Sequence, residues 1–161
     1  MFKLNRRQMI AATAAVVAAG PVIAESHGGT VHEVEMLNQN PDNPRQRMVF
    51  SPRVLVVQPG DTVKFLPTDR GHNSQSIDDM IPAGAAGWEG AINEEVEVTF
   101  DTPGFYGYQC KPHQTVGMVA AIIVAGEGAL DNLEDAKGVR QRGQAKKVWA
   151  EIFDEIDALE L

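Results

Sequence analysis

The chain has 161 residues, and its 22 acidic side chains outnumber the 14 Lys and Arg by eight. This length allows one domain with an adequate core, and an apolar fraction of 43% with 22% charged residues argues against wholesale disorder and a membrane bundle. The negative charge argues against general nucleic-acid binding. The single cysteine excludes an intramolecular disulfide, a four-cysteine zinc finger and an iron–sulfur cluster held by cysteines alone.

Residues 1–24 have the features of an export signal. A short basic stretch ending in Arg6 and Arg7 precedes an uncharged, mostly Ala and Val segment over residues 9–24. That segment is short for a membrane span, which needs about 20 apolar residues. Small residues stand at the −3 and −1 positions before a cut after Ala24, so we predict cleavage there and an exported mature protein. The arginine pair resembles a twin-arginine signal, and both that route and the Sec route are open.

The mature chain, residues 25–161, continues with short segments that are typical of β-strands. Alternating or β-branched apolar residues predict strands over residues 32–36, 53–57, 62–66, 95–100, 105–110 and 117–125. Turn signals separate them, such as the Pro-Gly-Asp sequence that begins at Pro59. Strands of about 5–6 residues with turns every 8–12 predict a mainly β fold, an antiparallel sandwich or barrel over residues 31–126.

Beyond Gly126 the pattern changes to that of two helices, predicted over residues 130–137 and 144–159. The second has an apolar stripe at helical spacing, formed by Val148, Ile152 and Ile156 and flanked by Trp149 and Phe153. Two helices this short cannot form a domain, so we expect residues 127–161 to pack on the sandwich. A partner-binding helix is the alternative. No stripe requires a second copy, and a monomer is expected.

The segment from the end of one predicted strand, at Cys110, to the start of the next, at Met118, carries three metal-binding side chains. Cys110, His113 and Met118 offer a thiolate, an imidazole and a thioether within nine residues. One Cys, two His and a weak axial Met form the donor set of a blue-copper site. Soft sulfur favours Cu(I) and imidazole accepts Cu(II), so an intermediate geometry moves little on electron transfer. Four protein donors leave no open position for a substrate, which indicates an electron carrier and not an enzyme.

The second imidazole has three candidates. His27 lies near the mature N-terminus, where a fixed geometry is hard to hold. His32 lies on the same face of the first predicted strand as Val34 and is interpreted as a strand-end residue. His72 follows a strand and a tight loop, and we expect it to be the ligand. Taken singly, each donor has an ordinary structural role, since a lone cysteine is most often a small buried hydrophobe.

Several segments together resemble the cupredoxins, and among them the pseudoazurin branch. They are Pro59-Gly60-Asp61-Thr62-Val63, Gly71-His72-Asn73, residues 103–113 and Met118. The two C-terminal helices and Met80-Ile81-Pro82 point to the same branch. The resemblance spans about residues 31–159. It implies a Greek-key β-sandwich and a periplasmic type 1 copper protein that shuttles one electron, in some relatives to a copper nitrite reductase.

By position, the resemblance implies that one copper ion is bound by His72, Cys110, His113 and Met118. Asn73 would join the two ligand loops by hydrogen bonds and support the thiolate, and Pro112 would stiffen the loop and remove one N–H near the sulfur. His113 would present its ring edge to solvent as the electron port.

The expected partners are redox proteins, namely a copper nitrite reductase, a cytochrome or another periplasmic oxidoreductase. Without residues 1–24 the net charge is −11, and several basic residues concentrate in the predicted helices. This charge departs from the lysine-ringed port that the resemblance implies. Two other hypotheses use the same fold: a copper chaperone or storage protein with the same donors, and a redox-inert sandwich whose site holds zinc or nothing.

Overall fold

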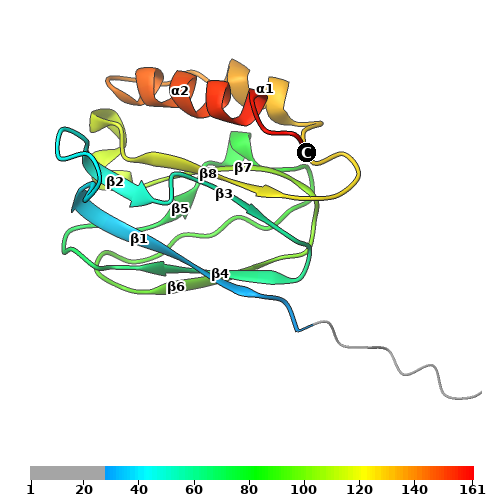
Figure 1. Cartoon of the computed structure of the whole chain (residues 1–161), viewed down its shortest axis with the longest axis horizontal. Helices are drawn as coiled ribbons and strands as arrows, with labels where there is room; N and C mark the ends of the chain where they lie inside the picture. Colours follow the sequence, from blue (N-terminus) through cyan, green and yellow to red (C-terminus); the bar gives the residue numbers. More distant parts are fainter. Residues whose placement is uncertain (1–27) are drawn as a thin grey trace, which may run out of the picture.

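The computed structural model describes residues 28–161. The expected export segment, its cleavage site after Ala24 and the candidate His27 lie outside the described residues. Within residues 28–161, no helix combines the length and the apolar character needed to span a bilayer. Two four-stranded sheets pack face to face, and two helices cover the outer face of one of them (Figure 1).

The first sheet has the strand order β2-β1-β4-β6 and consists of β1 (Val31–Gln39), β2 (Arg47–Ser51), β4 (Asp61–Leu66) and β6 (Val96–Phe100). The second has the order β3-β8-β7-β5 and consists of β3 (Val54–Val57), β5 (Gln75–Ser76), β7 (Gly104–Gln109) and β8 (Val119–Val124). The helical elements are the 3₁₀ turns η1 (Asp78–Met80) and η2 (Lys111–Val116) and the helices α1 (Leu133–Gly138) and α2 (Ala145–Asp157). The predicted mainly β sandwich with two C-terminal helices is confirmed.

The strand pairing differs from the antiparallel prediction at two places. β1 pairs with β4, and β3 with β8, in parallel. The chain changes sheets between β2 and β3 and again between β3 and β4, so these consecutive strands do not pair with each other. Parallel neighbours need such crossing connections. Neither β2 nor β5 is predicted from the sequence, because β2 follows a turn-rich stretch and β5 has only two residues.

Strand β8 separates two hydrophobic cores. All of its residues are buried, and their side chains alternate between the two faces of the sheet. Ala120, Ile122 and Val124 join the core between the sheets, whereas Val119, Ala121 and Ile123 join the core beneath the helices. Burial of both faces explains why this segment is a continuous apolar run instead of an alternating pattern.

Helix α2 closes the second core with a face centred on Trp149. Ile152 and Ile156 are buried as predicted, whereas Val148 is only half-buried. The buried face is rotated toward Trp149 because its ring lies against β7. There a Cβ added at Gly107 would lie 3.0 Å from the indole Cη2 atom, so a glycine is needed for this close packing.

The register of β5 and β7 brings two distant segments of the chain together. Gln75 lies opposite Gln109, so the residues just before β5 lie beside those just after β7. Cys110 directly follows β7, η2 comes next, and the chain returns as β8 antiparallel to β7. The segment of His72 and the η2 turn therefore meet at one end of the sandwich.

Candidate metal centre

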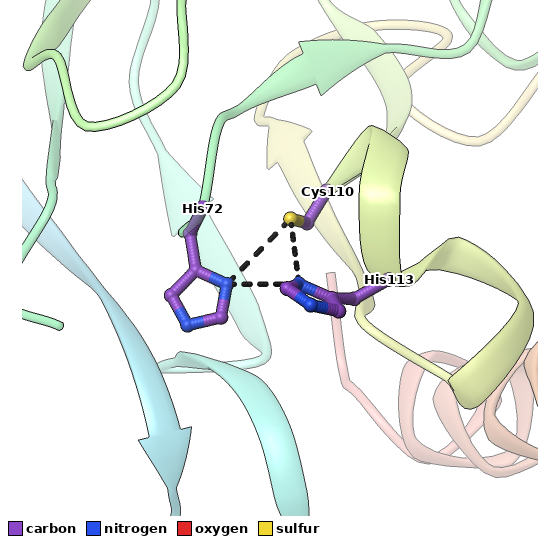
Figure 2. Close-up of side chains that lie close together, drawn as sticks. All are labelled: His72, Cys110 and His113. Atoms are coloured by element: carbon purple, nitrogen blue, oxygen red, sulfur yellow. Dashed lines mark hydrogen bonds between the residues drawn. The ribbon is translucent and has the colours of Figure 1, made fainter. Parts of the chain in front are cut away.

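Three of the four expected ligands converge at this end of the sandwich. The Nδ1 atoms of His72 and His113 are 3.1 Å apart, and they lie 3.7 Å and 3.5 Å, respectively, from Sγ of Cys110. Figure 2 shows the three side chains pointing toward one another, His72 from the segment after β4 and the others from the connection between β7 and β8. Among residues 28–161, this is the only group of three or more His, Cys, Asp or Glu side chains with ligand atoms this close.

This triangle has the size of a trigonal metal site. For metal–nitrogen bonds of about 2.0 Å and a metal–sulfur bond of about 2.3 Å at 120°, the nitrogens would be about 3.5 Å apart and each would lie about 3.7 Å from the sulfur. The observed separations of 3.1, 3.5 and 3.7 Å agree to about 0.4 Å. One thiolate and two imidazoles are the in-plane donors of a blue-copper site. The residues therefore fit one copper ion.

His72 is oriented by a hydrogen bond on the far side of its ring. Its Nε2 lies 3.0 Å from Oδ1 of Asn38, a carbonyl oxygen that can only accept, so Nε2 carries the proton and donates. Nδ1 is then left with its lone pair directed toward Cys110 and His113. The ring is fully buried, and this burial lowers the pKa of His72, with the nearby His113 adding to the effect. The imidazole is thus held neutral and in the tautomer that binds a metal.

Cys110 is also fully buried. Burial raises the pKa of its thiol, while the backbone N–H groups of Asn73 and His113 lower it in part. A metal ion binds the thiolate, so metal binding at this site releases a proton. The two N–H groups stabilise the sulfur once it carries negative charge.

Asn73 connects the two segments that carry the three donors. Its Oδ1 accepts a 2.8 Å hydrogen bond from the backbone N–H of Lys111, and its Nδ2 donates to the carbonyl oxygen of Gly90 at 3.0 Å. The side chain is buried. Because Asn73 follows His72 and Lys111 follows Cys110, this one amide fixes the distance between the two ligand segments.

The η2 turn positions His113 and Met118 by backbone hydrogen bonds. The N–H of His113 donates to the carbonyl of Cys110 at 3.0 Å, and the N–H of Met118 donates to the carbonyl of His113 at 3.1 Å. Gly117 ends the turn with a φ of 103°, a left-handed conformation that favours glycine. Met118 is fully buried in the same core as Cys110, whereas Pro112 is exposed near the start of the turn.

His32 has the structural role expected for it. Its Nε2 lies 2.9 Å from Oδ2 of Asp61. The same carboxylate accepts hydrogen bonds from two backbone N–H groups, that of Gln58 at Oδ2 and that of Thr30 at Oδ1. Asp61 begins β4, and His32 lies near the start of β1, so this contact joins the N-terminal ends of two paired strands. His32 is not part of the metal cluster.

Two residues that support the site were not identified from the sequence. Asn38 bonds His72, and Asn93 fixes the backbone before and after that ring: its Oδ1 accepts from the N–H of Gly71 at 2.6 Å, and its N–H donates to the carbonyl of His72 at 2.9 Å. Asparagine is common in turns, and both lie far from His72 in the sequence. No local signal distinguishes them from ordinary turn residues.

Comparison with known proteins identifies a family of copper-binding proteins. The model of the copper-binding proteins of the plastocyanin/azurin family matches residues 35–125. The pseudoazurin of Methylorubrum extorquens is 42% identical over 123 residues, which cover 76% of this chain and 80% of that protein. The pseudoazurin of Paracoccus pantotrophus is 36% identical over 134 residues, covering 83% and 89%.

The structural comparison agrees with the sequence comparison. A solved pseudoazurin structure from Sinorhizobium meliloti has a TM-score of 0.75 at 44% identity and covers 80% of this chain and 98% of that one. The match therefore includes nearly all of the solved chain, and the identity lies well above the range in which only the fold is shared. The chain thus belongs to the pseudoazurins, within the plastocyanin/azurin family of copper-binding proteins.

Proposed function

We propose that the chain is a periplasmic electron carrier whose single copper ion is held by His72, Cys110, His113 and Met118. The observation that carries this proposal is the triangle of one sulfur and two imidazole nitrogens at 3.1–3.7 Å, in which Cys110 and His72 are buried. Copper, when bound, supplies the one-electron Cu(II)/Cu(I) couple. Four protein donors would leave no position for a substrate, which favours a carrier over an enzyme.

The protein holds the metal-binding side chains rigidly, which favours electron transfer. Asn38 holds the ring of His72 from behind, Asn73 ties the ligand segments together, and the hydrogen bonds of η2 fix His113. Donors that are held in place before the metal binds move little when its charge changes. A small rearrangement lowers the barrier to gaining and losing an electron.

His113 is the proposed port for electrons. It is the half-buried member of the triangle, and the apolar residues Pro112 and Val116 beside it are exposed, Val116 to 53%. The adjacent Lys111 lies 3.3 Å from Glu89, and both side chains are about two-thirds exposed. This pair reduces the local charge, so contact with a redox partner would depend mainly on the apolar rim. A periplasmic oxidoreductase such as a copper nitrite reductase or a cytochrome is the proposed partner.

Export is part of the same proposal. The basic, apolar and small-residue regions of residues 1–24 support cleavage after Ala24 and delivery of residues 25–161 as one domain to the periplasm. The intact mass of protein recovered from the periplasmic fraction tests this. A mass that includes residues 1–24 would contradict it.

The function is tested by absorption spectroscopy of the copper-loaded protein. The oxidised form should show intense thiolate-to-copper absorption in the visible range, which a reductant bleaches and an oxidant restores. Cys110→Ser should abolish it, whereas the control Met48→Leu, a half-buried residue of the inter-sheet core, should retain it. Visible absorption that survives the loss of the thiol would contradict the site. Transfer of the copper to a chelating acceptor during redox cycles would instead support a chaperone.

A further inference from the structure

The linker between α1 and α2 contacts the turn that carries His113. The backbone N–H of Gln144 donates to the carbonyl oxygen of Thr115 at 2.8 Å. The side chain of Gln114 donates through Nε2 to Oε1 of Gln141 at 3.2 Å. The Nε2 of Gln141 in turn lies 3.3 Å from Sδ of the buried Met80, so the amide of Gln141 is held between the core and the turn.

Gly143 makes this approach possible. Its φ is +57°, and a Cβ added there would overlap with the backbone carbonyl of Thr115. Gly117 is close to α2 in a similar way, because a Cβ at this position would lie 2.9 Å from Cγ2 of Val148. The C-terminal extension is therefore in direct contact with residues 114–117, the part of the chain between His113 and Met118.

The same turn is held at its other end by Asn73, which bonds the N–H of Lys111. The η2 turn thus has one fixed point before His113 and a second set of contacts after it. The first comes from the segment of His72 within the sandwich. The second comes from the helical extension, which lies outside both sheets (Figure 1).

We propose that the α1–α2 linker is a positioning element for the copper ligands, with Gln141 and Gly143 as its main residues. Neither residue belongs to the ligand cluster. Both act through Gln114 and Thr115 on the turn that sets the directions of His113 and Met118. This inference rests on the proposed function. It gives the C-terminal helices a second role, beyond covering the sheet, in setting the properties of the metal centre.

The first test compares two glycine substitutions in the extension. Gly143→Ala should change the intensity ratio of the visible copper bands and shift the reduction potential, because Thr115 must move. Gly138→Ala is the matched control, since a Cβ at Gly138 has nothing within 4 Å. Far-UV circular dichroism and the thermal unfolding of the copper-free proteins separate these effects from a loss of fold. Spectra and potentials that are the same for both variants would overturn the proposal.

The second test removes the hydrogen bond without altering the backbone. Gln141→Ala should change the band ratio in the same sense and raise the rate of copper loss to a chelator about fivefold, the factor that corresponds to one ordinary hydrogen bond. Gln141→Glu keeps an acceptor for Gln114 and should restore the wild-type ratio. A Gln141→Ala protein with wild-type spectrum and copper loss contradicts the proposal, even where Gly143→Ala does not fold. If the wild-type protein itself has no visible copper band, the proposed function fails instead.

Discussion

The hydrogen bond between Asn38 and His72 leads to the sharpest prediction about metal affinity. Asn38→Ala removes Oδ1, which lies 3.0 Å from the buried Nε2 of His72 and is the only hydrogen-bond acceptor for it among the described contacts. An unpaired buried donor costs about 1–3 kcal/mol, and 1.4 kcal/mol is tenfold in affinity. The metal-free protein can relieve this cost by moving the proton to Nδ1, next to His113. The copper-loaded protein cannot, because Nδ1 then binds the metal.

Copper binding should therefore weaken about tenfold to a hundredfold, the range usual for losing an outer partner of a ligating histidine. Competition with a chelator of known affinity measures this, and urea unfolding of the metal-free protein reports the separate effect on the free energy of unfolding. Asn38→Asp keeps an acceptor and should retain most of the affinity. Asn40→Ala, whose hydrogen bonds lie in the exposed loop that follows β1, is the matched control. An affinity of Asn38→Ala equal to that of Asn40→Ala would refute the tautomer argument.

Two further predictions concern the stability of the metal-free protein. The backbone N–H of Gln58, then His32 and the N–H of Thr30, hold the pKa of Asp61 below its usual value of 3.8 against the opposing effect of burial. The carboxylate should therefore stabilise the fold above about pH 4 and lose this effect as the pH falls through the lowered pKa. Acid titrations followed by circular dichroism should show a weaker pH dependence for Asp61→Asn, and an unchanged one would contradict this assignment. Ile152→Ala should lower the free energy of unfolding by about 2–5 kcal/mol, because the side chain is fully buried beneath α2. Asp154→Ala, on the exposed face of α2, should change the free energy of unfolding by less than about 0.5 kcal/mol. Equal urea midpoints for Ile152→Ala and Asp154→Ala would show that α2 does not contribute to the core.

Most of the β-sandwich is predictable because its signals are local. Alternating apolar residues in β6 and the continuous apolar run of β8 are typical of half-buried and fully buried strands. The parallel pairings are not predictable in this way, because they depend on which sheet the chain joins after β2 and β3. The rotation of α2 toward Trp149 depends on the space above Gly107, which belongs to another element.

The residues of the candidate site also differ in whether a local sequence signal identifies them. The spacing of Cys110, His113 and Met118 lies within one short connection, and His72 stands in a motif that can be recognised from neighbouring residues. Asn38 and Asn93 carry no such signal, because an amide acquires its role from the ring or backbone it contacts. The contact of Gln141 and Gly143 with η2 likewise joins residues that are distant in the sequence.

The sequence by itself determined the donor types, the blue-copper chemistry that they favour and the β-rich class of the fold, since these follow from residue identity and local periodicity. Only the tertiary structure decided that the two imidazole nitrogens and the sulfur stand 3.1–3.7 Å apart, which tautomer His72 adopts and which outer residues hold the ligand turn. The physical reason is that distances and hydrogen bonds between remote segments depend on how the sheets and helices pack, and this packing is a property of the whole chain.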